Sequence, residues 1–283
     1  MGRCNETASS SELMRRRERH TFRAAMDFHS ILLVTQYRGG NFAGWQRQPV
    51  VRTVQAEMER VLLRLCGTEI AAVGAGRTDA GVHAHGQGVG VWVPERWTPI
   101  ALQRAMNALL DDDVWIRSAH LMAPTFHPRR SAIARRYRYL VGTDPLSRSP
   151  FRRPFEWAMH RTLDAHALHA EAESLLGEHQ FRAFAVAHTA PIDDHHRCVI
   201  QHAAWTERDG GWVFEIVANR FLHHMVRFLV GTMVEVAQGR MQRGSIARLL
   251  TLVHNAETAR PAPAHGLSLH EVVYPSDVYR VLL

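Results

Sequence analysis

The chain of 283 residues is 46% hydrophobic, so it can bury one large core or the cores of two domains of ordinary size. Its 34 basic residues, all of them arginine, exceed its 27 Asp and Glu residues and give a formal charge of +7, which favours a polyanionic partner unless it only reflects coding bias. The sequence has no apolar run long enough for a membrane span, no apolar leader and no CxxC motif among its three cysteines; these patterns argue against a membrane protein and a thiolate metal site and predict a cytoplasmic protein.

The N-terminal segment is basic and lacks a regular pattern. Residues 1–29 contain the cluster Arg15, Arg16, Arg17 and Arg19 and show no sustained helical or strand period. We therefore expect a basic flexible tail over residues 1–29.

Residues 30–145 alternate strand and helix patterns and form the first predicted half. Thr53 can cap a helix whose apolar residues recur every three or four positions until Gly67, a residue suited to end it. Pro99 suits the first turn of a second helix that reaches Leu110. Alternating or β-branched patterns predict strands at five places: 31–37, 68–74, a stretch that ends at Val93, 114–122 and 135–141.

A connector rich in Pro, Ser and Arg, residues 142–154, marks the boundary to a second half over 155–283. In that half, Asp209-Gly210-Gly211 is typical of a hairpin turn. The expected strands are 199–207, 212–218 and 267–274, and the expected helices are 164–176, 221–238 and 245–254. Hairpins interrupted by helices favour the α+β class, with a largely antiparallel sheet and helices packed on one side.

A glycine-rich loop over 74–81 carries an acid where a phosphate-binding loop would hold none. Its spacing is GxGxxxxG, and Arg77, Thr78 and Asp79 occupy the stretch that would approach a pyrophosphate. No GK[ST] follows, so both a dinucleotide site and a P-loop are rejected. The loop is suited to present Asp79, although an Asp before Ala-Gly is more often only a turn residue.

Histidines occur in close pairs that bring zinc into consideration. The pairs are His83 and His85, His195 and His196, and His223 and His224. Neither an HExxH motif nor cysteine partners accompany them, so no metal site is predicted.

Arg227 lies inside the apolar run 225–229 of a predicted helix. A guanidinium buried there would need a carboxylate or a phosphate as its partner. Periodicity leaves open the alternative that Arg227 emerges on the solvent side. His223, four residues earlier, shares its helix face.

Arginines and aromatic rings alternate over residues 126–139, a pattern that favours RNA binding. In a strand over 135–141, Tyr137 points to one face and Arg136 and Arg138 point to the other. Tyr137 could equally be a core residue. Arg136 and Arg138 are expected to bind the phosphate backbone.

The loop Gly76-Arg77-Thr78-Asp79-Ala80-Gly81-Val82-His83 resembles the signature of the tRNA pseudouridine synthase A (TruA) family. Other blocks resemble those of the family and come in the same order: Gly44-Trp45-Gln46-Arg47-Gln48, Phe126-His127-Pro128-Arg129, Ala134-Arg135-Arg136-Tyr137-Arg138-Tyr139, Phe221-Leu222-His223-His224-Met225-Val226-Arg227 and Ala264-His265-Gly266-Leu267. The resemblance covers roughly residues 30–275.

This resemblance implies an enzyme that converts uridine to pseudouridine in the anticodon stem-loop of tRNA, at positions 38, 39 and 40, with no cofactor or metal. It also implies two similar α+β halves that share the central sheet, with helices on one side and a basic cleft on the other, and a homodimer.

The resemblance assigns roles by position. Asp79 would be the catalytic carboxylate, Arg227 its ion-pair partner and Tyr137 the ring that stacks on the flipped uracil. Arg77 would help displace the target base, and Leu267 would line the uracil pocket. Breaking N1–C1′ and forming C5–C1′ needs a group that attacks C1′ or removes the 2′ proton, and one carboxylate can do either.

Two other functions stay open from the residues alone. One is an RNA-binding or chaperone protein that keeps the cleft without turnover, and the other is a histidine-ligated metal hydrolase. The presence of Asp79 favours the enzyme that acts on tRNA.

Overall fold

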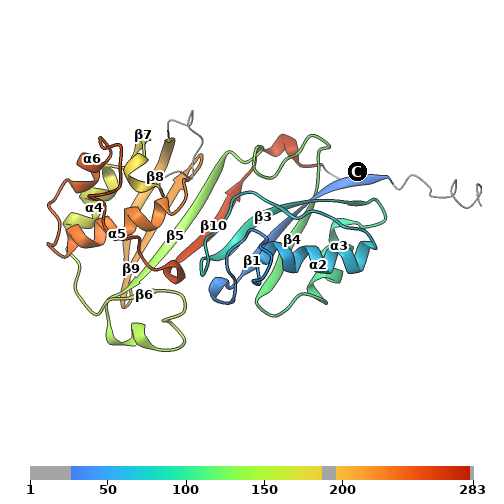
Figure 1. Cartoon of the computed structure of the whole chain (residues 1–283), viewed down its shortest axis with the longest axis horizontal. Coiled ribbons are helices and arrows are strands. Elements are labelled where there is room, and N and C mark those ends of the chain that lie inside the picture. The colour runs from blue at the N-terminus through green and yellow to red at the C-terminus, as the bar shows by residue number, and fades with distance from the viewer. Residues whose placement is uncertain (1–26, 187–195, 281–283) are drawn as a thin grey trace, which may run out of the picture.

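One ten-stranded sheet runs through the whole molecule in the computed structural model, which describes residues 27–186 and 196–280 (Figure 1). The strands are β1 Phe28–Tyr37, β2 Val73–Gly74, β3 His83–Pro94, β4 Val114–Met122, β5 Ala134–Gly142, β6 Trp157–Ala158, β7 Gly177–Gln180, β8 Arg197–Arg208, β9 Gly211–Ala218 and β10 Leu267–Val273. Of the expected tail, residues 1–26 lie outside the described part, and strand β1 already begins at Phe28.

The sheet order is β4-β1-β3-β10-β5-β9-β8-β7, with β2 paired to β3 and β6 paired to β5. All these pairs are antiparallel except β3 with β10 and β5 with β6. The predicted α+β class with a largely antiparallel sheet is confirmed. The last strand, β10, lies between β3 and β5, so the end of the chain contributes to the centre of the sheet.

The described helices are α2 Val54–Cys66, α3 Pro99–Asn107, α4 Ala165–Glu173, α5 Met225–Ala237 and α6 Ser245–Leu249. The expected caps of α2 are present, since Thr53 Oγ1 accepts a hydrogen bond from the Ala56 amide at 3.4 Å and Gly67 ends the helix with a φ of 70°. Within residues 27–186 and 196–280, none of the helices combines the length and apolar character needed to cross a membrane.

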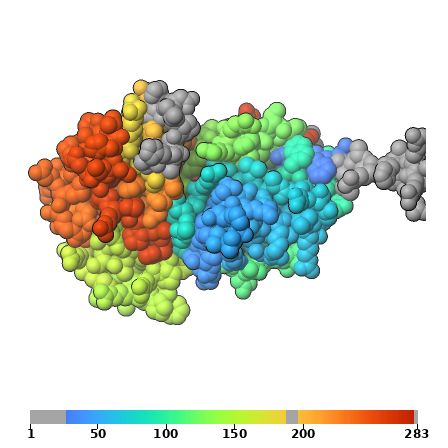
Figure 2. Space-filling view, viewed as in Figure 1, coloured from blue at the N-terminus to red at the C-terminus, as the bar shows by residue number. Residues whose placement is uncertain are grey.

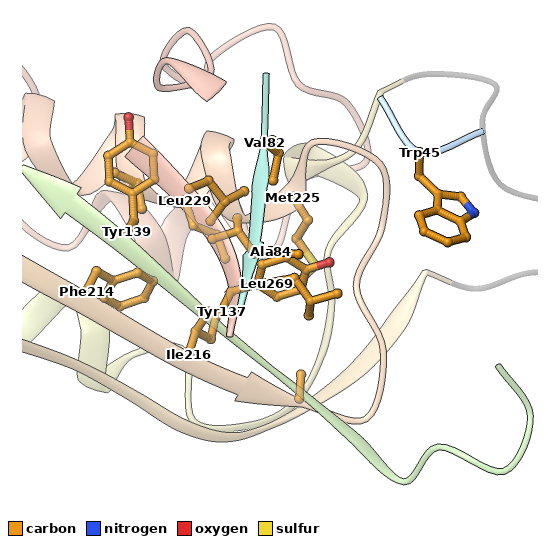
Figure 3. Packing of buried hydrophobic residues seen from close by; sticks show 14 of the residues in the cluster. Trp45, Val82, Ala84, Tyr137, Tyr139, Phe214, Ile216, Met225, Leu229 and Leu269 are labelled. Atoms are coloured by element: carbon orange, nitrogen blue, oxygen red, sulfur yellow. The ribbon is translucent and has the colours of Figure 1, made fainter. Parts of the chain in front are cut away.

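Side chains alternate between the two faces of the sheet. Ala84, Leu269 and Tyr137 are register partners on β3, β10 and β5, and all three belong to the core into which the helices pack (Figure 3). The neighbouring register pair, Arg138 and Glu215, points to the opposite face, because adjacent strand positions alternate. The helices therefore cover one face of the sheet, as the sequence predicts.

Several elements are shorter than the sequence predicts. α5 begins at Met225 rather than at residue 221, because His224 adopts a left-handed φ of 62° that a helix cannot contain. The strand expected over 68–74 shrinks to β2, and α6 ends at Leu249. Strands β6 and β7 were not predicted, since two and four residues show too little alternation to be read from sequence.

Candidate active site

Asp79 lies in the loop between β2 and β3, and hydrogen bonds of the preceding residue, Thr78, hold this loop in place. The Thr78 carbonyl accepts a hydrogen bond from the Trp45 amide at 3.0 Å, and Thr78 Oγ1 lies 2.7 Å from the Tyr37 hydroxyl. A Cβ at Gly44, whose φ is 100°, would stand 2.8 Å from the Thr78 carbonyl oxygen, so glycine is needed where these two segments approach. Asp79 is presented by a fixed loop rather than by a free turn.

Three side chains from the start of α5 surround the Asp79 carboxylate. Arg227 Nη1 lies 3.2 Å from Oδ2, His224 Nε2 lies 3.3 Å from Oδ2, and His223 Nε2 lies 3.5 Å from Oδ1. The N-terminal end of α5 adds the positive end of its helix dipole. The ion pair between Asp79 and Arg227 that the resemblance implies is present, and the Asp79 side chain keeps 18% of its surface exposed, so a ligand can reach it.

Arg227 is anchored on the segment that leads into β10. Its Nε donates to the Ala262 carbonyl at 2.8 Å, and the Ala262 amide donates to the Arg227 carbonyl at 2.9 Å. Its side chain is only 15% exposed, so the alternative that it emerges into solvent is wrong. These contacts fix the guanidinium against Asp79.

His224 differs from Arg227 in its charge at neutral pH. Burial lowers the pKa of His224 below its ordinary value of 6.5; the charge of Asp79 opposes this effect, and Arg227 and His223 add to it. Since the ring is then neutral near pH 7, Arg227 supplies the permanent positive charge beside the carboxylate.

Tyr137 belongs both to the core and to the surroundings of Asp79. It is 8% exposed, and its ring meets Phe221 edge-on with 5.0 Å between the ring centroids. Figure 3 shows its side chain beside Leu269, its register partner. Burial raises the pKa of Tyr137, and the nearby charges of Tyr37 and Asp79 contribute. Its hydroxyl has no hydrogen-bond partner among the described residues.

Leu267 is buried and Arg77 is exposed. Leu267 opens β10, is 5% exposed and stands two positions from Leu269, the register partner of Tyr137. Arg77 is exposed two residues before Asp79, and its side chain has no ion-pair partner within the described part of the chain.

Arg136 and Arg138 lie on the other face of the sheet from Tyr137. Both form ion pairs with Glu215, in the case of Arg138 with 2.7 Å between Nε and Oε2. Arg136 also lies 3.3 Å from Glu271. The structure does not bring these two arginines to Asp79.

A metal ion would find three donors at this site. Asp79, His223 and His224 each offer a ligand atom, and these atoms lie within 4.8 Å of one another. The set resembles the nitrogen and oxygen donors that zinc accepts. Arg227 already contacts Asp79 Oδ2, however, and a cation there would have to displace the guanidinium.

The histidines of the other two pairs do not contact Asp79 in the described part of the chain. His83 accepts a hydrogen bond at Nδ1 from the Gly39 amide at 3.0 Å and lies 3.0 Å through Nε2 from the Pro154 carbonyl, so both of its ring nitrogens are occupied. His85 is exposed and stands next to His270, with 5.5 Å between the ring centroids. His195 lies outside the described residues.

Sequence reasoning did not predict that His223 and His224 contact Asp79. The signal for His223 was its four-residue spacing from Arg227, which places both on one helix face. For His224 no periodic signal exists, because it precedes the helix in a left-handed conformation.

The comparisons with known proteins agree with the signature. A family model described as tRNA pseudouridine synthase matches residues 172–275. Relatives named tRNA pseudouridine synthase A include proteins of Shouchella clausii (37% identical, over 86% of this chain and 92% of the relative), Pseudoalteromonas translucida (38%, 87% and 92%) and Solidesulfovibrio magneticus (40%, 86% and 90%). A solved structure of a Cbf5-Nop10-Gar1 complex, covering 72% of this chain with 11% identity and a TM-score of 0.32, is too dissimilar to carry an argument. The relatives, each matched over most of its length, show that this chain belongs to the tRNA pseudouridine synthase A family.

Proposed function

We propose that the protein isomerises uridine to pseudouridine in the anticodon stem-loop of tRNA, at positions 38, 39 and 40, with Asp79 as the nucleophile or base. Family membership supports tRNA as the substrate and the isomerisation as the reaction. The observation that carries the role of Asp79 is its carboxylate, held by Arg227 in a fixed loop and close to the ring of Tyr137.

The reaction needs no group that the chain lacks. The N1–C1′ bond breaks, uracil rotates and the C5–C1′ bond forms. C5 then loses its hydrogen as a proton, and N1, which keeps the electron pair of the broken bond, takes up a proton. Asp79 either attacks C1′ and is later released, or removes the 2′ proton and returns it. In both routes Arg227 balances the charge of the carboxylate and fixes its direction.

The target base must leave the helical stack before Asp79 can reach C1′. Stacking on an aromatic ring can return about 1–3 kcal/mol of that cost, and we assign this contact to Tyr137. Its hydroxyl, without a partner among the described residues, is available to the base. Arg77, exposed beside Asp79, would fill the space that the flipped base leaves, and Leu267 would line the uracil pocket.

The proposal also covers Arg136 and Arg138, the cellular location of the protein and its oligomeric state. Arg136 and Arg138 would contact a part of the tRNA away from the target uridine, since they lie on the other face of the sheet. Cys66 and Cys198 are buried thiols, which fits the reducing cytoplasm. A homodimer is proposed on the family resemblance alone.

The proposal is tested by mapping pseudouridine in an unmodified tRNA transcript that carries uridine at positions 38, 39 and 40. Incubation with the protein should produce pseudouridine at these positions, and transcripts with cytidine there should stay unmodified. Pseudouridine only outside the anticodon stem-loop would contradict the site assignment, and its complete absence would contradict the function.

A further inference from the structure

A cavity of about 630 Å³, open to solvent, lies between the connector after β5 and the loop after β1, outside the residues assigned above. Its lining residues are Gly40, Arg148, Pro150, Arg153, Pro154 and His265. In Figure 2 the connector forms the yellow-green part of the surface, beside the blue segment that contains the loop after β1. The two walls come from segments more than a hundred residues apart in sequence.

The cavity carries positive charge that no acid of the described chain balances. Arg148 and Arg153 are exposed, and neither has an ion-pair partner among the described residues. Arg152, between them in sequence, behaves differently, because it pairs with Asp144 at 2.9 Å and with Glu156 at 2.8 Å. Arg152 thus stabilises the connector, whereas Arg148 and Arg153 are exposed to solvent.

Both walls are held in place, so the cavity exists before any ligand arrives. The ring of His83 joins them, since Nδ1 accepts from the Gly39 amide and Nε2 contacts the Pro154 carbonyl. The side chain of Glu156 is only 3% exposed, and it forms ion pairs with Arg152 and with Arg208 of β8. A preformed site binds at a lower entropic cost than a mobile loop.

The cavity adjoins the surroundings of Asp79. His83, which joins its walls, ends the signature loop that carries Asp79. A Cβ at Gly81 would stand 3.3 Å from Cβ of Ala264, the residue before His265. Arg227, the partner of Asp79, donates to the carbonyl of Ala262, three residues before His265 in the cavity wall. A polymer bound at Asp79 can therefore extend into the cavity.

We propose that Arg148 and Arg153 form a subsite for a backbone phosphate of the RNA strand that carries the target uridine. Unpaired guanidinium groups in a fixed cavity are suited to phosphate oxygens, which accept two parallel hydrogen bonds from one arginine. Phe151 of the same connector is 88% exposed, and an exposed ring among arginines is typical of surfaces that bind a nucleic acid strand rather than a small anion. The subsite rests on the proposed function, because it assumes that RNA lies across Asp79.

The test is tRNA binding by the full chain, measured against salt concentration in the Asp79→Asn background so that turnover plays no part. Replacing both Arg148 and Arg153 with Gln should weaken binding about tenfold and lower the slope of log Kd against log salt by about 0.7–0.9 for each lost contact. Replacing both with Lys should restore most of the slope, since the charges return.

Arg248→Gln is the matched control, because Arg248 is exposed on α6 and pairs with Glu257. The double Gln variant should melt at the wild-type temperature, since neither replaced side chain forms a hydrogen bond or an ion pair with another described residue. A slope and a Kd equal to those of the control would overturn the subsite. Loss of binding in the double variant, together with no pseudouridine formed by the wild-type protein, would keep the subsite and contradict only the proposed function.

Discussion

Replacing Arg227 with Gln should cost both stability and activity, because this guanidinium contacts both the partly buried carboxylate of Asp79 and the Ala262 carbonyl. At the 3.2 Å between Nη1 and Asp79 Oδ2, opposite charges attract by about 5 kcal/mol at an effective dielectric constant of about 20, before desolvation is counted. Removing one partner costs about 3–5 kcal/mol in a buried pair and about 0–1 kcal/mol in an exposed one. With exposures of 15% and 18%, and with the Nε bond to Ala262 also lost, we expect a cost of about 2–3 kcal/mol.

A loss of this size lowers the melting temperature by about 3–5 °C in a chain of this length. Activity should fall by about 100-fold in kcat/KM or more, equivalent to about 2.7 kcal/mol, since Asp79 loses its permanent positive neighbour. Release of tritium from tRNA labelled at uracil C5 measures the reaction, and scanning calorimetry measures stability. Arg227→Lys should recover stability better than activity, because an ammonium cannot reproduce the planar fork. Wild-type melting and turnover in Arg227→Gln would refute the reasoning.

Three further predictions concern Glu156, His83 and Tyr137. Glu156→Gln should destabilise the protein by about 3 kcal/mol in urea unfolding, because Arg152 and Arg208 lose their shared buried partner; an unchanged midpoint would show that the pairs contribute nothing. Burial lowers the pKa of His83, so the unfolded chain takes up its proton first as the pH falls; stability is complete above the ordinary pKa of 6.5 and is lost below it, by at most about 1.4 kcal/mol per pH unit. His83→Asn should make urea unfolding less dependent on pH between 5 and 7, and an equal dependence in variant and wild type would contradict the assignment. Tyr137→Phe should keep tRNA affinity within about threefold, whereas Tyr137→Ala should weaken it by about 1–3 kcal/mol in a filter-binding titration; equal affinities of the two variants would exclude stacking.

The sequence predicted the fold where local signals and packing agree. Helix α2 has a Thr cap, a Gly stop and an apolar stripe, and the turn at Asp209-Gly210 joins β8 to β9 as expected. The position of β10 between β3 and β5 could not be predicted, because its partners are set by long-range packing rather than by its own residues. Strands β6 and β7 were not predicted, because they are too short to show a clear alternation of residue types.

The candidate site was predictable in part. If buried, an arginine inside an apolar helix needs an anion as its partner, and Asp79 in its glycine loop is that anion. Alternation along β5 separated Tyr137 from Arg136 and Arg138, but nothing in the sequence showed that Glu215 on β9 would pair with both arginines. The contact of His224 with Asp79 depends on a left-handed residue before α5, a conformation that no pattern of residue types indicates for histidine.

The central claim is that the Asp79 carboxylate performs the isomerisation. Asp79→Asn keeps the size of the side chain but removes its charge, so it should still fold and bind tRNA, although loss of the ion pair with Arg227 lowers its stability. Tritium release from C5-labelled tRNA, compared between equal amounts of the two proteins, tests the claim most directly. We expect no release above background from Asp79→Asn, and release at the wild-type rate would exclude Asp79 as the catalytic carboxylate.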